Sequence, residues 1–229
     1  VPLLNVYGFI NFSREFPGGK DVNRSFPGTT KGSLASRIAK TLTQEILPHV
    51  DFGLDFHTGG ASIYNYPQAR VYRNDPKSLE LAEQFSMPYL IKTGLIAKSL
   101  RKVAHTKGIP MVVFEGGESL RIDEFSIKEG IRGIRRVLHA HGMITKRPAL
   151  NKSVVLESNT WIRASRSGIF NIHMRSGDKV MKGDLLGEIT DPNNHFVAKV
   201  KCKKDGVIYG HNNNPVINQG DALFHIGFI

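Results

Sequence analysis

The sequence predicts an α/β fold, a mixed sheet with flanking helices, followed by a smaller all-β part. Up to about Arg147, short apolar runs alternate with stretches of helical periodicity, which is typical of α/β domains. Beyond Pro148 the helical periodicity disappears, Gly and Asn become frequent, and short β-type segments follow one another at turn spacing. We therefore divide the 229 residues into a domain at residues 1–150 and a domain at residues 151–229.

Periodicity sets the elements of the first domain, because strands are short apolar runs and helices repeat their apolar residues every three or four positions. The expected strands are 3–6, 52–56 and 109–114. One expected helix begins at about Ser33, and three more span 78–85, 94–104 and 126–141. The helix at 126–141 has the clearest pattern. Its buried stripe is expected to consist of Ile127, Ile131, Ile134 and Leu138.

An internal repeat organises the second domain. The pattern Val-x-x-Gly-Asp-x-Leu-x-x-Ile runs from Val180 to Ile189, and it returns with Ile in place of Val from Ile217 to Ile226. Each Gly-Asp pair is expected to make a tight turn that leads into a half-buried strand. The repeat thus predicts two related hairpin halves that fold as a small pseudo-symmetric β structure.

The charge balance raises the question of a nucleic-acid function, since 31 Lys and Arg face 20 Asp and Glu and the formal net charge is +11. The surplus is spread along the chain, with no basic tail and no basic stretch interleaved with aromatic residues. This distribution argues against nucleic-acid binding, although it can draw an anionic substrate toward a cleft. No apolar run approaches the ~20 residues of a membrane span, so no membrane partner is expected.

Cysteine usage bears on the compartment. Cys202 is the one cysteine, so no internal disulfide can form, and a reducing compartment is favoured. The first residues do not have the pattern of a signal peptide. Together these features predict a cytoplasmic protein.

Two loops of the first domain place a titratable residue after an apolar strand and before glycines. His57 ends the strand at 52–56, where α/β folds place groups that contact ligands, and Asp55 on the same strand face can orient its imidazole. The alternative is a turn histidine held by its neighbours. Glu115 follows the strand at 109–114 and suits general acid/base work, whereas Glu118 is expected to be a solvated loop carboxylate.

A third loop, at 21–28, places Asn23 beside Arg24 just before a helix. An Arg side chain can bind a carboxylate with two parallel hydrogen bonds, and Asn adds another donor. The pair can therefore hold a substrate carboxylate. Loop Asn and Arg are also ordinary surface residues, and that alternative stays open for this pair alone.

Taken together, the three loops resemble the succinylglutamate desuccinylase/aspartoacylase family. They read Asp-x-Asn-Arg-x-Phe-Pro-Gly at 21–28, Asp-Phe-His-Thr-Gly at 55–59 and Phe-Glu-Gly-Gly-Glu at 114–118. The resemblance extends over most of the chain, and it implies a carboxypeptidase-like α/β domain followed by a barrel-sandwich (lipoyl-like) β domain. It also implies a zinc-dependent amidohydrolase that acts on carbon–nitrogen bonds other than peptide bonds, with a small, carboxylate-bearing N-acyl amino acid as substrate.

The resemblance also assigns catalytic roles. It implies that His57 is the third zinc ligand. It makes Glu115 the general base that deprotonates zinc-bound water and then protonates the leaving amine. Arg14 is the match for an arginine that polarises the scissile carbonyl, although its spacing from the Asn-Arg pair is looser than in the family.

Three further residues concern the substrate. The resemblance implies that Asn23 and Arg24 clamp a carboxylate of the acyl-amino acid. Arg101, on the expected helix before the Glu115 strand, is a candidate for a second substrate contact. The β domain is expected to cover the active-site cleft or to build a homo-oligomer.

One departure from the family pattern concerns the metal. The first two zinc ligands of the family form a His-x-x-Glu motif ahead of the strand expected at 3–6, and none of the nine histidines here has Glu three residues later. A catalytic zinc site needs three protein ligands and an open position. Either the chain lacks an N-terminal segment, which its start at Val1 favours, or it is a metal-free, non-catalytic binding or scaffold protein on the same fold. The 229 residues alone are expected to bind zinc weakly or not at all.

Overall fold

A mixed sheet runs through both halves of the chain in the computed structural model, which describes residues 1–193 and 195–229. Its central path is β1-β4-β2-β11-β13-β6, with β3, β5 and β8 attached beside it. The strands of the N-terminal half are β1 (Gly53–Gly59), β2 (Ile63–Tyr72), β3 (Tyr89–Thr93), β4 (Met111–Glu118) and β5 (Val154–Leu156). Those of the C-terminal half are β6 (Ser158–Arg163), β8 (Lys179–Val180), β11 (Gly206–Asn212) and β13 (Ala222–Phe228).

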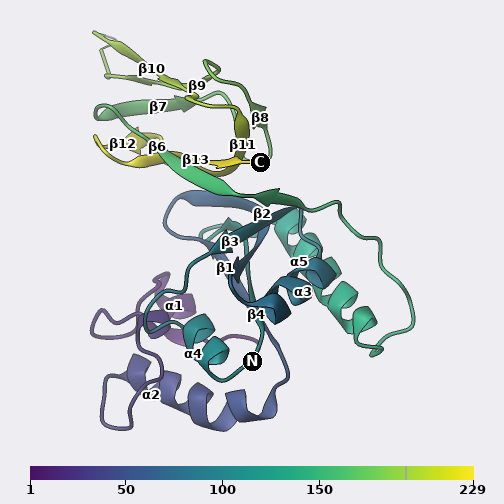
Figure 1. The fold of residues 1–229 in the computed structure, drawn as a ribbon. Helices are drawn as coiled ribbons and strands as arrows, with labels where there is room; N and C mark the ends of the chain where they lie inside the picture. The colour runs from purple at the N-terminus through teal and green to yellow at the C-terminus, as the bar shows by residue number, and fades with distance from the viewer. Residues whose placement is uncertain (194) are drawn as a thin grey trace.

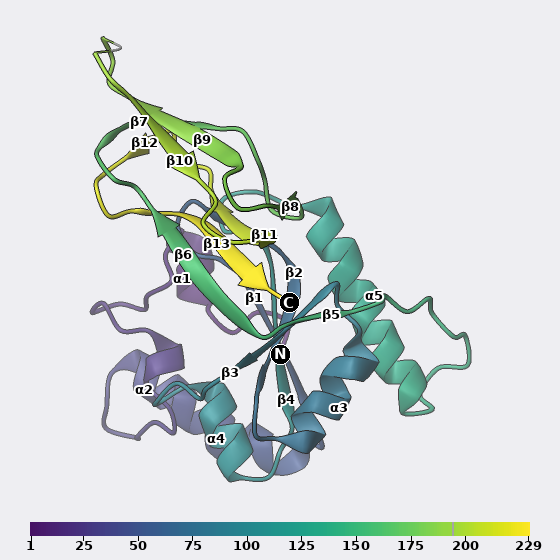
Figure 2. The same cartoon turned by 45° about the horizontal axis from the view of Figure 1, so that its top comes forward.

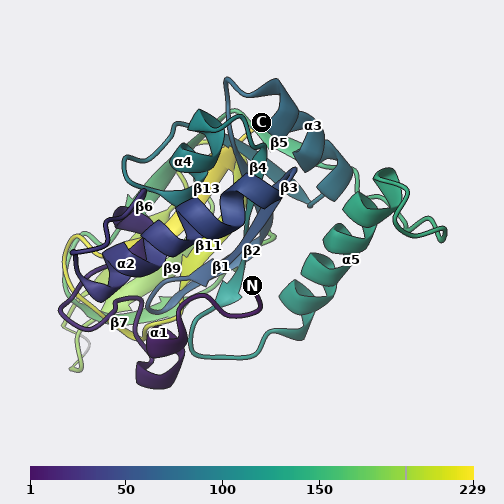
Figure 3. The same cartoon turned by 90° about the horizontal axis from the view of Figure 1, so that it is seen from below.

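Helices cover both faces of the N-terminal part of this sheet (Figure 3). α3 (Pro76–Phe85) and α5 (Glu124–Ala140) pack on one face, where Phe85, Phe114 and Val71 share a buried core. α2 (Leu34–Thr41) and α4 (Leu100–Thr106) lie on the other side. α2 continues into η2 (Leu42–Ile46) and η3 (Leu47–His49), and the remaining short helices are α1 (Val6–Asn11) and η1 (Val22–Arg24). The mixed α/β fold is therefore confirmed.

Strand register aligns the ends of β1 and β4. These two strands are parallel, and His57 pairs with Glu115. β2 runs antiparallel to β4 on its other side, with Gln68 opposite Glu115 and Arg70 opposite Val113. Directly paired residues point to the same face of a sheet, so the His57, Glu115 and Arg70 side chains share the face that α2 and α4 flank.

The C-terminal half consists of two packed layers of strands (Figures 1 and 2). A second sheet has the order β10-β9-β7-β12, formed by β10 (Val197–Lys201), β9 (Leu185–Thr190), β7 (Gly168–Ile172) and β12 (Val216–Ile217). It faces β6, β11 and β13 across one apolar core that contains Phe170, Leu186 and Phe224. The sequence repeat accounts for this core, because Val180, Leu186 and Ile189 and their counterparts Ile217, Leu223 and Ile226 are all buried in it.

The two Gly-Asp turns of the repeat have the same structure. Asp184 accepts a hydrogen bond from the Met181 amide, and Asp221 accepts one from the Asn218 amide, both at 2.7 Å. The glycine before each aspartate has a positive φ, +99° at Gly183 and +89° at Gly220. Side chains other than glycine rarely adopt this conformation, so the turn explains the glycine in both copies.

Two expected elements are wrong. Residues 3–5 are not a strand, and α1 begins at Val6 because the Asn5 side chain caps it by accepting a hydrogen bond from the Gly8 amide at 2.8 Å. The helix expected at 94–104 begins only at Leu100, where Ser99 caps it by accepting from the Lys102 amide. In both places a polar capping residue, which the apolar pattern does not weigh, determines where the helix starts.

The buried face of α5 also differs from the expectation. Ile127 and Ile131 are about half exposed, whereas Glu129 and Arg136 are buried. Gly130 and Gly133 turn toward the sheet, where an added Cβ at Gly133 would lie 2.5 Å from the Phe85 ring. These two glycines let the helix approach the sheet closely, so they and Val137 face the core, whereas Ile127 and Ile131 do not and Ile134 and Leu138 are partly buried.

Candidate active site

His57 and Glu115 lie side by side at the carboxyl ends of two adjacent parallel strands. The strand pairing brings His57 Nδ1 within 3.8 Å of a Glu115 carboxylate oxygen. The regular pairing of β1 with β4 ends at these two residues, because the register shifts between His57 and Gly59, so the two side chains stand near the rim of the sheet. This is the position at which parallel α/β sheets present groups to a ligand.

Asp55 orients the imidazole of His57. Its carboxylate lies 2.9 Å from His57 Nε2, the contact expected for two residues on one strand face. Burial alone would lower the pKa of His57, but the hydrogen bond and the charge of Asp55 raise it, and Glu115 adds to this effect. The net result is a pKa above the ordinary value for histidine.

Two side chains of β2 hold the Glu115 carboxylate. Asn65 donates a hydrogen bond to Glu115 Oε2 at 3.1 Å, and the Arg70 guanidinium lies 3.6 Å from Oε1. Gln68, which is fully buried, in turn accepts a hydrogen bond from Arg70 Nε at 3.4 Å. The carboxylate is therefore fixed from one side, and its remaining surface faces a pocket.

That pocket has a volume of about 180 Å³ and gathers the residues singled out from the sequence. Its lining includes Arg14, Asn23, Arg24, His57, Arg101 and Glu115. These residues come from the N-terminal loops, α4 and two strands, so the fold brings together groups that are up to about a hundred positions apart. We call it the polar pocket.

The loop residues around the polar pocket have different surroundings. Asn23 uses its side-chain oxygen to accept a hydrogen bond from the Leu100 amide at 2.8 Å, which ties η1 to the start of α4. Arg24 is exposed and donates to the backbone oxygen of Asn23. Arg14 forms an ion pair of 2.8 Å with Asp21.

Arg101 is the most buried of these arginines. Only 8% of its surface is exposed, and Nη2 donates to Thr93 Oγ1 at 2.9 Å and to the Gly94 backbone oxygen at 3.0 Å. Burial, together with the nearby charge of Arg70, lowers the pKa of this guanidinium below its ordinary value.

Sequence reasoning missed Arg70 and Asn65. Both lie on β2, a strand that was not expected because the segment 63–72 contains no apolar run. A signal was available in the spacing of Gln68, Arg70 and Tyr72, polar residues at every second position between apolar neighbours, which is a strand pattern with one polar face.

Glu118 was expected to be a solvated carboxylate, and this is wrong. It is buried, forms an ion pair with Arg121 at 2.8 Å, and accepts a hydrogen bond from Asn213 Nδ2 at 2.7 Å. Asn213 follows β11, so the C-terminal half covers the end of β4 and replaces the water that a loop carboxylate would otherwise bind.

The site offers one clear metal ligand. Across residues 1–193 and 195–229, no three His, Cys, Asp or Glu side chains form a group that could hold a metal ion. His57, oriented by Asp55, has the carboxylate–imidazole arrangement that is usual for zinc-bound histidines. One imidazole does not meet the requirement for three protein ligands, so the described residues do not by themselves make a zinc site.

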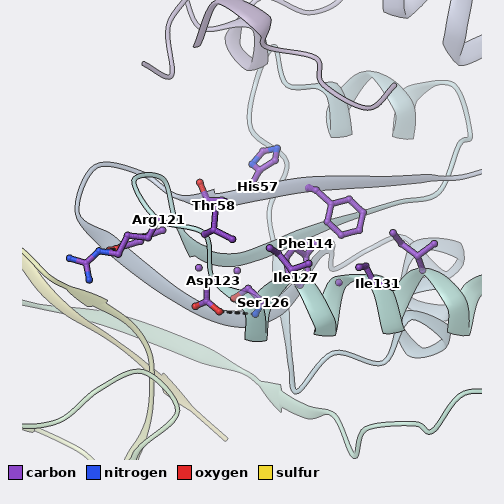
Figure 4. A pocket seen from close by; sticks show the side chains of 15 residues that line it. His57, Thr58, Phe114, Arg121, Asp123, Ser126, Ile127 and Ile131 are labelled. Atoms are coloured by element: carbon purple, nitrogen blue, oxygen red, sulfur yellow. Dashed lines mark hydrogen bonds and ion pairs between the residues drawn. The ribbon is translucent and has the colours of Figure 1, made fainter. Parts of the chain in front are cut away.

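A second, apolar pocket of about 430 Å³ lies between α5 and the strands β1 and β4 (Figure 4). Phe56, Phe114, Ile127 and Ile131 line it, and the half-exposed isoleucines of α5 therefore face this space. The His57 ring points away from the α5 side chains (Figure 4). The polar chemistry is thus concentrated on the opposite face of β1. Within the part of the chain described, no helix has the length and apolar character needed to cross a membrane.

Comparison with known proteins gives consistent results. Residues 1–141 match the family model of the succinylglutamate desuccinylase/aspartoacylase catalytic domain. The chain is 27% identical over 240 residues to an N-alpha-acetyl-L-2,4-diaminobutyric acid deacetylase of Halomonas elongata, covering 97% of this chain and 70% of the relative.

Solved structures share the fold along nearly the whole chain. A succinylglutamate desuccinylase from a Silicibacter species has a TM-score of 0.88 at 25% identity, and the match covers 99% of this chain and 73% of that one. A product-bound ectoine utilization protein from Ruegeria pomeroyi has a TM-score of 0.89 at 24% identity, and the match covers all of this chain and 74% of that one. With the family model matching well over half of its residues, the chain belongs to the succinylglutamate desuccinylase/aspartoacylase family.

Proposed function

We propose that this protein hydrolyses the amide bond of a small, carboxylate-bearing N-acyl amino acid. The observation that carries the proposal is the meeting of His57 and Glu115 in one polar pocket with several arginines. An oriented imidazole, a carboxylate held on one side only, and guanidinium groups are what acyl transfer to water requires. Membership of a family of deacylases supports the same reaction.

Glu115 is assigned the proton transfers. A water molecule attacks the carbonyl carbon, Glu115 takes up a proton from the water, and the carbon–nitrogen bond breaks as Glu115 returns the proton to the leaving amine. Asn65 and Arg70 keep the carboxylate in place during both transfers. Arg14 or Arg70 is positioned to stabilise negative charge on the carbonyl oxygen, since both line the polar pocket.

Substrate binding is assigned to Asn23, Arg24 and Arg101, and a zinc ion to His57. Zinc dependence is the part of the proposal that rests on the family resemblance, because the described residues offer a single ligand. The alternative function is that of a metal-free protein that binds a small molecule without turnover. That the C-terminal strands form a barrel sandwich, that the protein is a homo-oligomer and that it is cytoplasmic remain predictions.

Substitution of Glu115 separates the two functions. We expect Glu115→Gln to reduce amide hydrolysis by about 100-fold or more, in the range of general acid–base catalysis, because the amide cannot take up a proton. The measurement is turnover of a panel of N-acyl amino acids, with metal content determined on the same samples. Glu83→Gln, an exposed position on α3, is the matched control. Unchanged turnover in Glu115→Gln would refute the role of the base, and no turnover by the parent protein would favour the binding function.

A further inference from the structure

The strand β11 of the C-terminal half lies directly beside β2, the strand whose side chains hold the Glu115 carboxylate. Asn65 of β2 donates a hydrogen bond to Glu115 Oε2 at 3.1 Å. In the strand pairing, Asn65 lies opposite Gly117 of β4 on one side and opposite Gly210 of β11 on the other. Neither cross-strand partner has a side chain that would compete for this space, so the Asn65 amide can extend toward Glu115.

Gly210 fits closely between Asn65 and His225. A Cβ added to Gly210 would lie 3.2 Å from Asn65 Oδ1 and 3.3 Å from His225 Cβ. Both separations are shorter than the optimum of about 3.5–4.0 Å between carbon atoms in contact. The φ angle of Gly210 is not positive, so the lack of space, and not the backbone conformation, accounts for the glycine. An alanine methyl group here would have to displace one of the two neighbours.

Of these two neighbours, His225 is held more firmly. Its ring stacks on Trp161 with 3.9 Å between the ring centroids, and Nε2 lies 2.5 Å from the Tyr209 hydroxyl and 3.0 Å from Asn159 Oδ1. Asn65, by contrast, makes one side-chain hydrogen bond to the described residues. Because a densely packed and hydrogen-bonded ring yields less easily than a single amide, a methyl group at this place would move Asn65.

The position of Asn65 matters for the base but not for the surface that binds a ligand. Glu115 lines the polar pocket, whereas neither Asn65 nor Gly210 belongs to its described lining. Asn65 therefore acts on the carboxylate from the side that faces away from the pocket. A change at Gly210 can alter the orientation of Glu115 and leave the pocket wall as it is.

Building on the proposed function, we propose that the C-terminal half takes part in catalysis, with Gly210 and Asn65 as positioning residues for Glu115. Gly210 of β11 leaves the space in which the Asn65 amide stays aligned with the carboxylate, and His225 closes the other side of that space. Such a contact can control turnover, because misplacing a reacting group by about 1 Å can cost about 100-fold in rate. This role differs from covering the cleft, since it requires no contact between the C-terminal half and the substrate.

Gly210→Ala tests the inference by kinetics and by crystallography. We expect kcat for hydrolysis of an N-acyl amino acid to fall about tenfold, since the displacement is smaller than 1 Å, and KM to stay within about twofold of the parent value. In the crystal structure of the variant, we expect Asn65 Nδ2 to lie more than about 3.5 Å from Glu115 Oε2, beyond hydrogen-bond distance. The separation in the parent protein is 3.1 Å.

Two further variants serve as controls. Gly183→Ala lies in the same half, and its φ of +99° makes alanine strained there, but no atom lies within 4 Å of an added Cβ. We expect this variant to lose stability and to keep the kcat and KM of the parent protein. The double variant Asn65→Ala/Gly210→Ala should have the kcat of Asn65→Ala alone, because alanine at position 65 leaves room for the methyl group and the two changes act through one contact.

The outcomes separate this inference from the proposed function. An Asn65 amide that does not move in Gly210→Ala overturns the inference, and so does a displaced amide with unchanged kcat. A double variant slower than Asn65→Ala also overturns it. If the parent protein hydrolyses no substrate, the proposed function fails, and the distance between Asn65 and Glu115 in the two crystal structures still decides whether β11 positions the carboxylate. If Gly210→Ala alone does not fold, a folded double variant supports the contact with Asn65 and an unfolded one overturns it.

Discussion

Two buried arginines illustrate how a single side chain can serve structure or ligand binding. Arg136 donates to the backbone oxygens of Phe85, Ser86 and Ala149 at 2.7 to 3.4 Å and lies near Glu129, so its charge is fully compensated within the protein. Arg101 lines the polar pocket, and among the described residues no carboxylate lies within ion-pair distance of it and its buried Nη1 atom has no hydrogen-bond partner. Burial is similar at the two positions, and the partners determine which of them is open to a ligand.

At the residue scale, the sequence predicted those site residues that follow apolar strands. His57 and Glu115 each stand between an apolar run and glycines, and this local pattern can be recognised in the sequence without knowledge of the fold. Arg70 and Asn65 could not be found in the same way, because their role depends on β2 pairing with β4, a contact between segments about 45 positions apart. The alternation at Gln68, Arg70 and Tyr72 indicates a strand with one polar face, but it does not show which strand pairs with it.

His225 predicts how acid affects stability. It is buried between the Tyr209 hydroxyl and the stacked Trp161 ring, and burial, with a contribution from Arg70, lowers its pKa to about 3. Unfolding restores an ordinary value near 6.5, so the unfolded state binds one more proton between these two pH values. Stability is then fully present above pH ~6.5 and falls by about 1.4 kcal/mol per pH unit below it.

We expect His225→Gln to flatten this acid dependence, because glutamine does not titrate. The measurement is the free energy of unfolding in urea at several pH values from 7.5 down to 5, compared between variant and parent so that the carboxylates contribute equally. His49→Gln, at an exposed position, should retain the dependence of the parent protein. Identical slopes for His225→Gln and the parent would contradict the assignment.

At the element scale, α5 shows why helical periodicity predicts that a helix forms better than it predicts its orientation. The interval of four between Ile127 and Ile131 correctly indicated a helix, and the core nevertheless receives Gly133 and Arg136. A glycine face permits closer packing on the aromatic rings than an isoleucine face would, since a Cβ added at Gly133 would lie only 2.5 Å from the Phe85 ring. The apolar side chains are left to line the pocket beside β1.

Arg136 anchors α5 to the segments before β3 and before β5. We expect Arg136→Met to destabilise the protein by about 2–4 kcal/mol, because the backbone oxygens of Phe85, Ser86 and Ala149 lose their donor in a buried place and an unsatisfied buried acceptor costs about 1–3 kcal/mol. Chemical denaturation monitored by circular dichroism measures the loss. Arg135→Met, at the exposed neighbouring position, should change stability by less than about 0.5 kcal/mol. Equal midpoints for the two variants would show that the anchor contributes nothing.

At the scale of the whole molecule, the two halves expected from composition share one sheet. The first residues of β2 pair with β11, through Asn65 opposite Gly210, and β3 pairs with β5 beyond the expected boundary at residue 150. Tyr209 of the C-terminal half is buried against Ile91 of the N-terminal half. The change of texture near Pro148 therefore marks where helices end, while hydrogen bonds and apolar contacts continue across it.

This continuity predicts a single cooperative unfolding transition. All helices of the described chain lie before residue 141, whereas the one tryptophan, Trp161, lies on β6 in the C-terminal half. Helical circular dichroism and tryptophan fluorescence thus report separate halves, and coincident curves are the test of one cooperative unit. Two separated transitions would instead establish independent domains.

Fragments of the chain test whether each half folds without the other. A fragment of residues 1–150 would expose one edge of β2 and one edge of β3 together with Ile91, so we expect it to lack a cooperative transition and to aggregate. A fragment of residues 157–229 keeps every buried residue of its own core, from Ile162 to Ile226, and is expected to fold. Sedimentation and thermal denaturation of the two fragments decide the matter. A well-folded 1–150 fragment would mean that the shared sheet contributes little, and that the boundary in composition is also a boundary in stability.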